Sequence, residues 1–217
     1  MESTEKKYRI VLASASPRRK ELLGWLEVPF EIIPSHVEEV TTMTRPHDVA
    51  EDLAALKGED IYRKLEDSNE VENPFVISSD TIVTLGETIY GKPKDKEDAF
   101  RMLGELSGKT HQVVTGVAMF FEDRKTKEKK RVVFSVSTLV TFDSIDKDLL
   151  ENYVNSNDPL DKAGAYGIQG QGLSFISRID GSYSNVVGFP LSDFVDHFKK
   201  ALELEHDSLG TWRELFN

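Results

Sequence analysis

Hydrophobic and polar positions along this chain follow two periods, one typical of strands and one typical of helices. Runs of β-branched and aromatic residues predict strands, and apolar residues three or four positions apart predict amphipathic helices. The predicted strands cover residues 8–13, 28–33, 75–85, 112–121, 132–142 and 173–179. The predicted helices begin after Ser16 and cover residues 48–65, 95–106, 146–154 and 190–204. Because strands and helices interleave without an internal repeat or a long linker, the pattern indicates one α/β domain.

We place this domain at residues 1–205 and treat residues 206–217 as a C-terminal tail. At 217 residues, the chain is long enough for one substantial core or for two lobes that share a cleft. Trp212, Leu215 and Phe216 are the large apolar residues of the tail. We expect them to pack back on the domain or to form part of an interface.

The junction between the first predicted strand and the first predicted helix carries an unusual charge. Ser16 is well placed as the N-cap, and Pro17 occupies the first helical position, where its missing N–H costs nothing. Arg18, Arg19 and Lys20 follow in the first turn, where the helix dipole favours anions. Free N–H groups, hydroxyls and unpaired cations at a helix start favour phosphate binding. The alternative is a basic surface turn.

Asp80 is the most unexpected polar residue within a predicted strand. It lies in a β-branched run between Val76 and Val83, although aspartate is depleted in strands. Such a carboxylate is usually hydrogen-bonded in a turn, but a partly buried aspartate is also a common general base or metal ligand. Because Ser79 and Thr81 make the segment polar on both sides, we favour the functional interpretation.

Two lysines and a pair of glutamates become informative if they reach the same cleft as Asp80. Lys57 lies at the edge of the buried face of its predicted helix, where a lysine usually extends to water. Lys92 stands between a glycine and a proline, which fix the backbone and project the side chain, although a simple turn lysine is an equal alternative. Glu38 and Glu39 are paired acids in a loop, usually solvated. Beside Asp80, such an acid would form a hard-oxygen site for Mg²⁺ or Mn²⁺.

Composition excludes several classes of function. The net charge of −11 argues against sequence-independent binding of nucleic acid, which needs a basic face. No apolar run approaches the ~20 residues that span a bilayer, and the N-terminal residues lack the apolar core of a signal peptide. We therefore expect a cytoplasmic protein with no membrane partner. The chain has no cysteine, and its five histidines show no metal-binding spacing.

Taken together, these segments resemble the Maf family of nucleoside triphosphate pyrophosphatases through nearly the whole chain. The segments that carry the resemblance are 14–19 (SASPRR), 38–39 (EE), Lys57, 79–81 (SDT), 91–93 (GKP), 106–108 (LSG) and 161–170 (DKAGAYGIQG). The resemblance implies a mixed sheet with flanking helices, a fold related to the inosine triphosphate pyrophosphatases, with two lobes around a nucleotide cleft. It also implies hydrolysis of a nucleoside triphosphate to the monophosphate and pyrophosphate, dependent on a divalent metal.

The resemblance also implies roles for individual residues. The triphosphate would be bound by Ser14, Arg19, Lys57 and Lys92. Glu39 and Asp80 would hold the metal, Mg²⁺ or Mn²⁺, and Asp80 would be the catalytic carboxylate that orients water or acts as base.

Three positions divide the family by the base of the nucleotide, and here they are Arg18, Thr81 and Gln169. This combination resembles the subgroup that acts on dTTP and UTP, whereas the other common subgroup has Trp, Gln and Glu there and favours methylated guanosine nucleotides. The resemblance therefore implies a house-cleaning pyrophosphatase for dTTP, UTP and modified pyrimidine nucleotides, and a homodimer is a family-level expectation. The alternative is a non-catalytic nucleotide-binding regulator of cell division or septation.

Overall fold

The computed structural model describes residues 7–68, 70–156, 158–204 and 212–216. Its strands are β1 (Arg9–Leu12), β2 (Phe30–Ile32), β3 (Pro74–Leu85), β4 (Thr88–Tyr90), β5 (Thr110–Glu122), β6 (Lys129–Phe142) and β7 (Ile176–Asp180). Its helices are α1 (Pro17–Gly24), α2 (Pro46–Ser68), α3 (Lys96–Leu106), α4 (Lys147–Asn155), α5 (Tyr183–Val187) and α6 (Leu191–Ala201). Short 3₁₀ turns cover Asp158–Asp161, Ala163–Ala165, Gln171–Phe175 and Trp212–Leu215.

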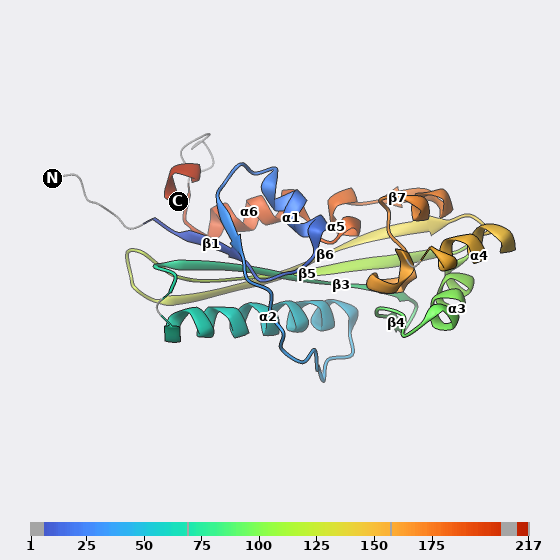
Figure 1. The fold of residues 1–217 in the computed structure, drawn as a ribbon. Coiled ribbons are helices and arrows are strands. Elements are labelled where there is room, and N and C mark those ends of the chain that lie inside the picture. The colour runs from blue at the N-terminus through green and yellow to red at the C-terminus, as the bar shows by residue number, and fades with distance from the viewer. Residues whose placement is uncertain (1–6, 69, 157, 205–211, 217) are drawn as a thin grey trace.

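All these strands belong to one mixed sheet. Its order is β2–β1–β3–β5–β6–β7, and β4 pairs with β3 outside this path. β1 pairs in parallel with β2 and with β3, whereas the other pairings are antiparallel. α2 lies along one face of the sheet, and α1, α5 and α6 cover the other face (Figure 1). The predicted α/β class, with a mixed sheet and flanking helices, is confirmed.

The predicted helix start after the first strand is also confirmed. The side chain of Ser16 caps α1 by accepting a hydrogen bond from the backbone N–H of Arg19, and Pro17 is the first helical residue. Leu22 and Leu23 are buried behind this start. The first turn of α1 contains no acidic residue that would offset its cations.

Two short elements and several boundaries differ from the sequence prediction. β4 and α5 were not predicted, because elements of three and five residues are too short to show a period. The predicted strand over 173–179 begins only at Ile176, and the residues before it form a 3₁₀ turn. Leu173 is exposed in that turn. Its apolar side chain therefore extended the predicted strand although it is not part of a buried face.

One edge of β3 has a gap in its pairing. β1 pairs with β3 as far as Ile77, and β4 pairs with β3 from Val83 onward. β5 pairs along the opposite edge from Val76 to Thr84, so residues 78–82 have no partner among the described strands on the edge shared by β1 and β4. β1 ends at Leu12, and the chain turns away there toward α1. The departure of β1 therefore opens the sheet beside Asp80.

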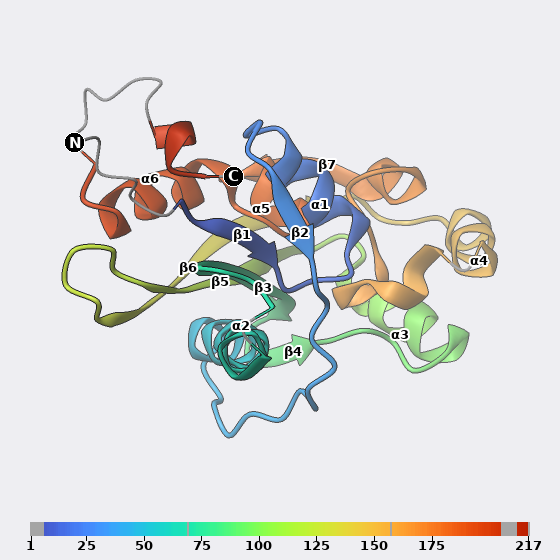
Figure 2. The same cartoon turned by 60° about the vertical axis from the view of Figure 1, so that its left-hand side comes forward.

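Large hydrophobic clusters lie at both ends of the long central strands. Phe75 and Phe121 belong to the cluster beneath α1 and α6, whereas Val83 and Phe142 belong to the cluster beside α3 and α4. Figure 2 shows α3 and α4 gathered at the end of the sheet away from α6. The two ends share one continuous sheet, and the gap in the edge of β3 lies between them. Among the described residues, no helix is both long and apolar enough to cross a membrane.

The described part of the tail packs against the first strand. The backbone N–H of Tyr8 donates to the carbonyl oxygen of Leu215 at 2.8 Å, and Phe216 is buried in the cluster beneath α1 and α6. Residues 205–211 and 217, and the side chain of Trp212, lie outside the described part of the chain. The boundary at residue 205 therefore stays a prediction.

We expect the substitution Gly116→Ala to destabilise the fold, because α2 lies directly on β5 at this glycine. A Cβ atom at Gly116 would lie 2.2 Å from the carbonyl oxygen of Ala50 in α2, so the helix must shift. We expect the free energy of unfolding to fall by at least ~2 kcal/mol, measured by equilibrium denaturation.

The matched control is Gly104→Ala in α3, where an added Cβ meets no heavy atom within 4 Å. This variant should keep its stability or gain up to about 1 kcal/mol from helix propensity. Equal stability of the Gly116→Ala variant and the wild type would contradict the close approach of α2 to β5.

Candidate active site

A cavity of about 660 Å³ opens at the gap in the edge of β3. Its walls come from the connection between β1 and α1, from α2, from the connection after β4, from the 161–169 segment and from the end of α5. Every site residue singled out in the sequence lines this cavity: Ser14, Arg18, Arg19, Glu39, Lys57, Asp80, Thr81, Lys92 and Gln169. The structure thus brings together residues that are far apart in the chain.

Asp80 and Thr81 reach the cavity from opposite faces of the sheet, because successive side chains of a strand alternate between faces. Asp80 faces α2, where its carboxylate contacts Lys57. Thr81 faces α1 and α5, where its hydroxyl contacts Arg19. Since no strand covers the edge between these two faces, one ligand could contact both residues at once.

The cluster on the α2 side consists of one lysine and two carboxylates. Lys57 Nζ donates to Asp80 Oδ1 at 2.6 Å and lies 3.0 Å from Glu39 Oε1. The Asp80 residue is only 7% exposed, whereas Glu39 lies in an exposed loop. A buried ion pair resists the removal of either partner, because the other charge would be left uncompensated. Lys57 therefore holds the Asp80 carboxylate in place.

The cluster on the α1 side is built around the Arg19 guanidinium. Arg19 Nη1 donates to Ser14 Oγ at 3.3 Å, and Nη2 donates to Thr81 Oγ1 at 3.2 Å. Arg19 Nε donates at 3.0 Å to the carbonyl oxygen of Gly188, which also accepts a hydrogen bond from Ser79 Oγ. Burial lowers the pKa of Arg19 from its usual range, and the nearby Asp80 carboxylate counteracts part of this effect.

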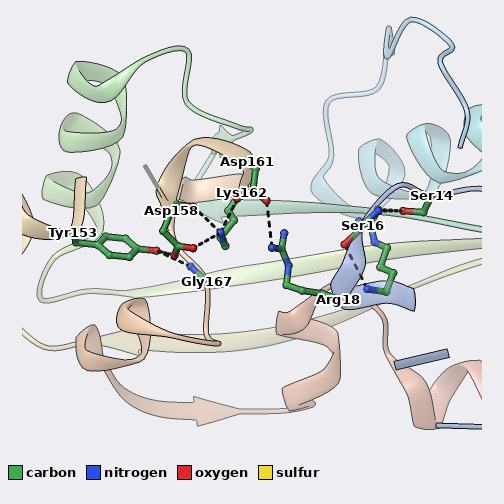
Figure 3. Close-up of polar contacts among 9 residues, drawn as sticks. Ser14, Ser16, Arg18, Tyr153, Asp158, Asp161, Lys162 and Gly167 are labelled. Carbon is green, nitrogen blue, oxygen red and sulfur yellow. Dashed lines mark hydrogen bonds and ion pairs between the residues drawn. The ribbon is translucent and has the colours of Figure 1, made fainter. Parts of the chain in front are cut away.

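The prediction of unpaired cations at the start of α1 is wrong for Arg18, whereas Arg19 has hydrogen bonds but no direct carboxylate partner among the described residues. Arg19 has the three partners just described, and Arg18 Nη1 lies 3.4 Å from Asp161 Oδ2. Figure 3 shows the Arg18 side chain extended toward Asp161. The partners Gly188 and Asp161 lie far along the chain, so the local sequence around α1 gives no sign of them.

Lys92 and Gln169 complete the wall of the cavity. The Lys92 side chain is exposed, and Gln169 is half-buried. Neither side chain has a hydrogen bond or an ion pair to the described residues. The Lys92 ammonium and the Gln169 amide are therefore available to a ligand.

Two features of the site were missed in the sequence. Gly188, in the left-handed conformation at the end of α5, presents its carbonyl oxygen to Arg19. Lys162 lines the cavity and is 9% exposed, although only its motif, and not the residue, was singled out. Gly188 ends a helix of five residues, which leaves no recognisable signal in the sequence. Lys162 could have been noticed, because it precedes a glycine-rich segment.

Within the described ranges, no group of three or more His, Asp or Glu side chains is arranged to hold a metal ion. A metal bound by Glu39 and Asp80 would thus need further oxygen ligands from substrate or water.

Comparison with known proteins places the chain among well-described relatives. Residues 9–201 match the family described as Maf-like protein. The chain is 45% identical over 184 residues to the dTTP/UTP pyrophosphatase of Alkaliphilus oremlandii, a match that covers 84% of this chain and 91% of the relative. It is 44% identical over 188 residues to the dTTP/UTP pyrophosphatase of Thermosipho africanus, covering 87% and 91%. The corresponding protein of Bacillus anthracis is 45% identical over 193 residues, covering 88% and 95%.

One buried histidine lies beneath the cavity wall. His111 Nε2 is 2.7 Å from the hydroxyl oxygen of Tyr166, which lines the cavity, and its ring packs edge-on against Phe142. His111 Nδ1 is buried without a hydrogen-bond partner among the described residues. Burial lowers the pKa of His111 from its usual 6.5 to about 4.

We expect His111 to make the protein less stable as the pH falls from 6.5 to about 4. In that range the unfolded chain binds a proton at this residue and the folded chain does not, so the free energy of unfolding falls by up to ~3 kcal/mol. In the variant His111→Gln, which does not titrate, this part of the pH dependence should disappear. Equilibrium denaturation at several pH values tests this, and parallel pH profiles for variant and wild type would contradict it.

Proposed function

This chain belongs to the Maf family, and we propose that it is a nucleoside triphosphate pyrophosphatase that acts on dTTP and UTP. The observation that carries the proposal is the cluster of Lys57 with the carboxylates of Asp80 and Glu39, in the same cavity as the half-buried Arg19. Paired carboxylates beside phosphate-binding cations suit the hydrolysis of a phosphoanhydride. The names of the relatives support the same activity.

The triphosphate would lie between the start of α1 and Lys92. Arg19 is fixed by hydrogen bonds to neutral acceptors, so its positive charge is not cancelled by a direct carboxylate partner. Ser14 supplies a hydroxyl beside it, and Lys92, which also lines the cavity, supplies an ammonium that has no partner among the described residues. In a protein with a net charge of −11, such a local group of cations is what a polyanion requires.

The reaction that we propose is attack of a water oxygen on the α-phosphorus. A bond forms between this oxygen and the α-phosphorus, and the bond to the oxygen that bridges to the β-phosphorus breaks. Pyrophosphate leaves with the electron pair of that bond, and a proton of the attacking water passes to Asp80.

Asp80 is suited to this role because Lys57 binds one of its oxygens, Oδ1. The other oxygen has no partner among the described residues and can accept a hydrogen bond from water. Negative charge develops on the leaving oxygen, where fixed cations stabilise it most effectively. We assign this stabilisation to Arg19 and Lys92.

We also propose that Glu39 and Asp80 hold a divalent cation, Mg²⁺ or Mn²⁺. The structure fits this role, because a single ammonium group already lies within 3.0 Å of oxygens from both carboxylates. Hard oxygen ligands suit both metals, and phosphate oxygens or water would complete the coordination. When bound, the metal would neutralise phosphate charge during the reaction.

Base selection is assigned to Arg18, Thr81 and Gln169. The Gln169 amide has a donor and an acceptor that can pair with the O4 and N3–H of thymine or uracil. Cytosine has the opposite donor and acceptor pattern at these positions, so the same amide orientation would leave groups unpaired. Hydroxyl groups on Thr81 and Thr115 hydrogen-bond to each other at 3.0 Å, which fixes the wall beneath Arg19.

We expect purified protein with Mg²⁺ or Mn²⁺ to release pyrophosphate, and not orthophosphate, from dTTP. In Asp80→Asn the carboxylate is replaced by an amide of equal size that is a poor base, so kcat should fall by ~10²–10⁴-fold. Separate detection of the two products and a thermal melt of the variant test this. Unchanged turnover of Asp80→Asn would refute the mechanism, and tight dTTP binding without any product from the wild type would support the regulator instead.

Adjacent acids provide a matched test of the metal assignment. Glu39 lines the cavity, whereas its neighbour Glu38 is exposed and does not. We expect Glu39→Gln to raise the Mg²⁺ concentration for half-maximal activity by ~10-fold or more, since a carboxylate ligand is lost. Glu38→Gln should leave the metal dependence unchanged. An equal effect of both substitutions would show that general surface charge, and not a ligand, is responsible.

A further inference from the structure

The ammonium group of Lys162 faces the cavity region but has no free hydrogen. Lys162 Nζ donates to the carbonyl oxygen of Asp158 at 2.6 Å, to Asp158 Oδ1 at 3.0 Å and to Asp161 Oδ1 at 2.6 Å. An ammonium has three hydrogens to donate, and all three are used here. Lys162 therefore differs from Lys92, whose ammonium is free to bind a phosphate.

The partners of Lys162 connect it to the segment that carries Gln169. Asp158 accepts a hydrogen bond at 2.9 Å from the hydroxyl of Tyr153, and this hydroxyl accepts one at 3.2 Å from the backbone N–H of Gly167. Burial and the bond to Asp158 raise the pKa of Tyr153, so its hydroxyl stays protonated and donates. Figure 3 shows this chain of contacts, which ends two residues before Gln169.

The stem of Lys162 also fixes the position of Gly167 by direct packing. A Cβ atom at Gly167 would lie 2.7 Å from Lys162 Cε, so only a glycine lets the chain pass this close. The lysine thus supports the backbone before Gln169 in two ways, by packing and through Tyr153.

A second branch leads from Lys162 to the start of α1. Asp161 accepts a hydrogen bond from Lys162 through Oδ1, and its Oδ2 lies 3.4 Å from Arg18 Nη1. In Figure 3, Arg18 and Asp161 extend toward each other from separate parts of the chain. One polar network centred on Lys162 therefore ends at Arg18 on one side and, on the other, at the backbone N–H of Gly167, two residues before Gln169.

We propose that Lys162 is a positioning residue for base selection, which sets Gln169 through Asp158, Tyr153 and Gly167, and sets Arg18 through Asp161. This inference rests on the proposed function, because it concerns selection among nucleotides. Among the described residues, this network shares no hydrogen bond with Asp80, Lys57 or Arg19. Its loss should therefore alter which base is accepted and leave phosphate binding intact.

Energetics favour a role in specificity over one in stability. Burying an ammonium requires desolvation, and replacing buried ion pairs by apolar residues of similar volume is often neutral or stabilising. A lysine that is 9% exposed at the cavity wall is thus poorly explained by stability alone. The burial of Lys162 is better explained by a hydrogen-bond network that positions Gln169 and Arg18 toward the nucleotide.

The variant Lys162→Met tests this, because methionine keeps most of the stem and removes the charge. We expect KM for dTTP to rise ~10-fold and the ratio of kcat/KM for dTTP over dCTP to fall ~10-fold, since a misplaced contact is costly. Inhibition by inorganic pyrophosphate should remain within about twofold of the wild type, because it has no base. Tyr153→Phe should shift the dTTP/dCTP ratio in the same direction by a smaller factor.

The matched control is Lys129→Met, which breaks a 2.7 Å ion pair with Glu66 that lies outside the cavity. Its KM and base ratio should be unchanged. If Lys162→Met does not fold, the ratio measured for Tyr153→Phe decides.

An unchanged dTTP/dCTP ratio overturns the inference. Pyrophosphate inhibition weakened as much as dTTP binding also overturns it, because Lys162 would then act on phosphate. Failure of the wild type to release pyrophosphate from any nucleotide is a separate result, which refutes the proposed function. In that case calorimetric affinities of the variants for dTTP and dCTP still decide the role of Lys162.

Discussion

The ion pair between Lys57 and Asp80 is the interaction on which the organisation of this molecule depends. Asp80 lies in the middle of the central strand β3 and is 7% exposed, so its charge requires a partner from a neighbouring element. Within the described part of the chain this partner is Lys57 of α2, and α2 must lie close to the sheet to provide it. Glycines at the contact make this possible: a Cβ at Gly58 of α2 would lie 2.5 Å from Ser78 Oγ, and one at Gly116 would meet the backbone of α2. The close packing of α2 on the sheet and the charged state of Asp80 therefore depend on each other.

The gap in the edge of β3 explains why this carboxylate reaches a cavity and is not sealed in the core. A fully paired strand would separate the two faces of the sheet. Here β1 leaves β3 at Ile77 and β4 joins it only at Val83, so side chains from both faces meet at the open edge. Asp80 brings the carboxylate cluster from one face, and Thr81 brings the Arg19 cluster from the other. In the proposed reaction, the first cluster activates water and the second binds phosphate.

The sequence was most informative where a residue departs from its local pattern. Asp80 in a β-branched run and arginines at a helix start indicated chemistry, and the site residues taken from the motifs all line the cavity. The sequence could not indicate how these groups are paired. The partners of Arg19 and Arg18, namely Gly188 and Asp161, lie more than 140 residues away along the chain, and no local pattern links them to α1. Likewise β4 and α5 were missed because such short elements form through tertiary contacts and not through a period of their own.

Two lysines that line the cavity, Lys57 and Lys162, have different partners and therefore different roles. Lys57 bridges two carboxylates, so the cluster of Lys57, Asp80 and Glu39 has an excess of one negative charge. A phosphate alone would be repelled by that excess negative charge, whereas a bound divalent cation would make the cluster positive. This favours joint binding of metal and triphosphate.

Lys162 instead donates all its hydrogens to acceptors from its own segment, and has none left to donate to a ligand. Its charge therefore acts on geometry, through the backbone before Gln169 and through Asp161. Discrimination between bases depends on which groups are left unpaired, so a site of this kind needs rigid contacts at the base as much as charge at the phosphates.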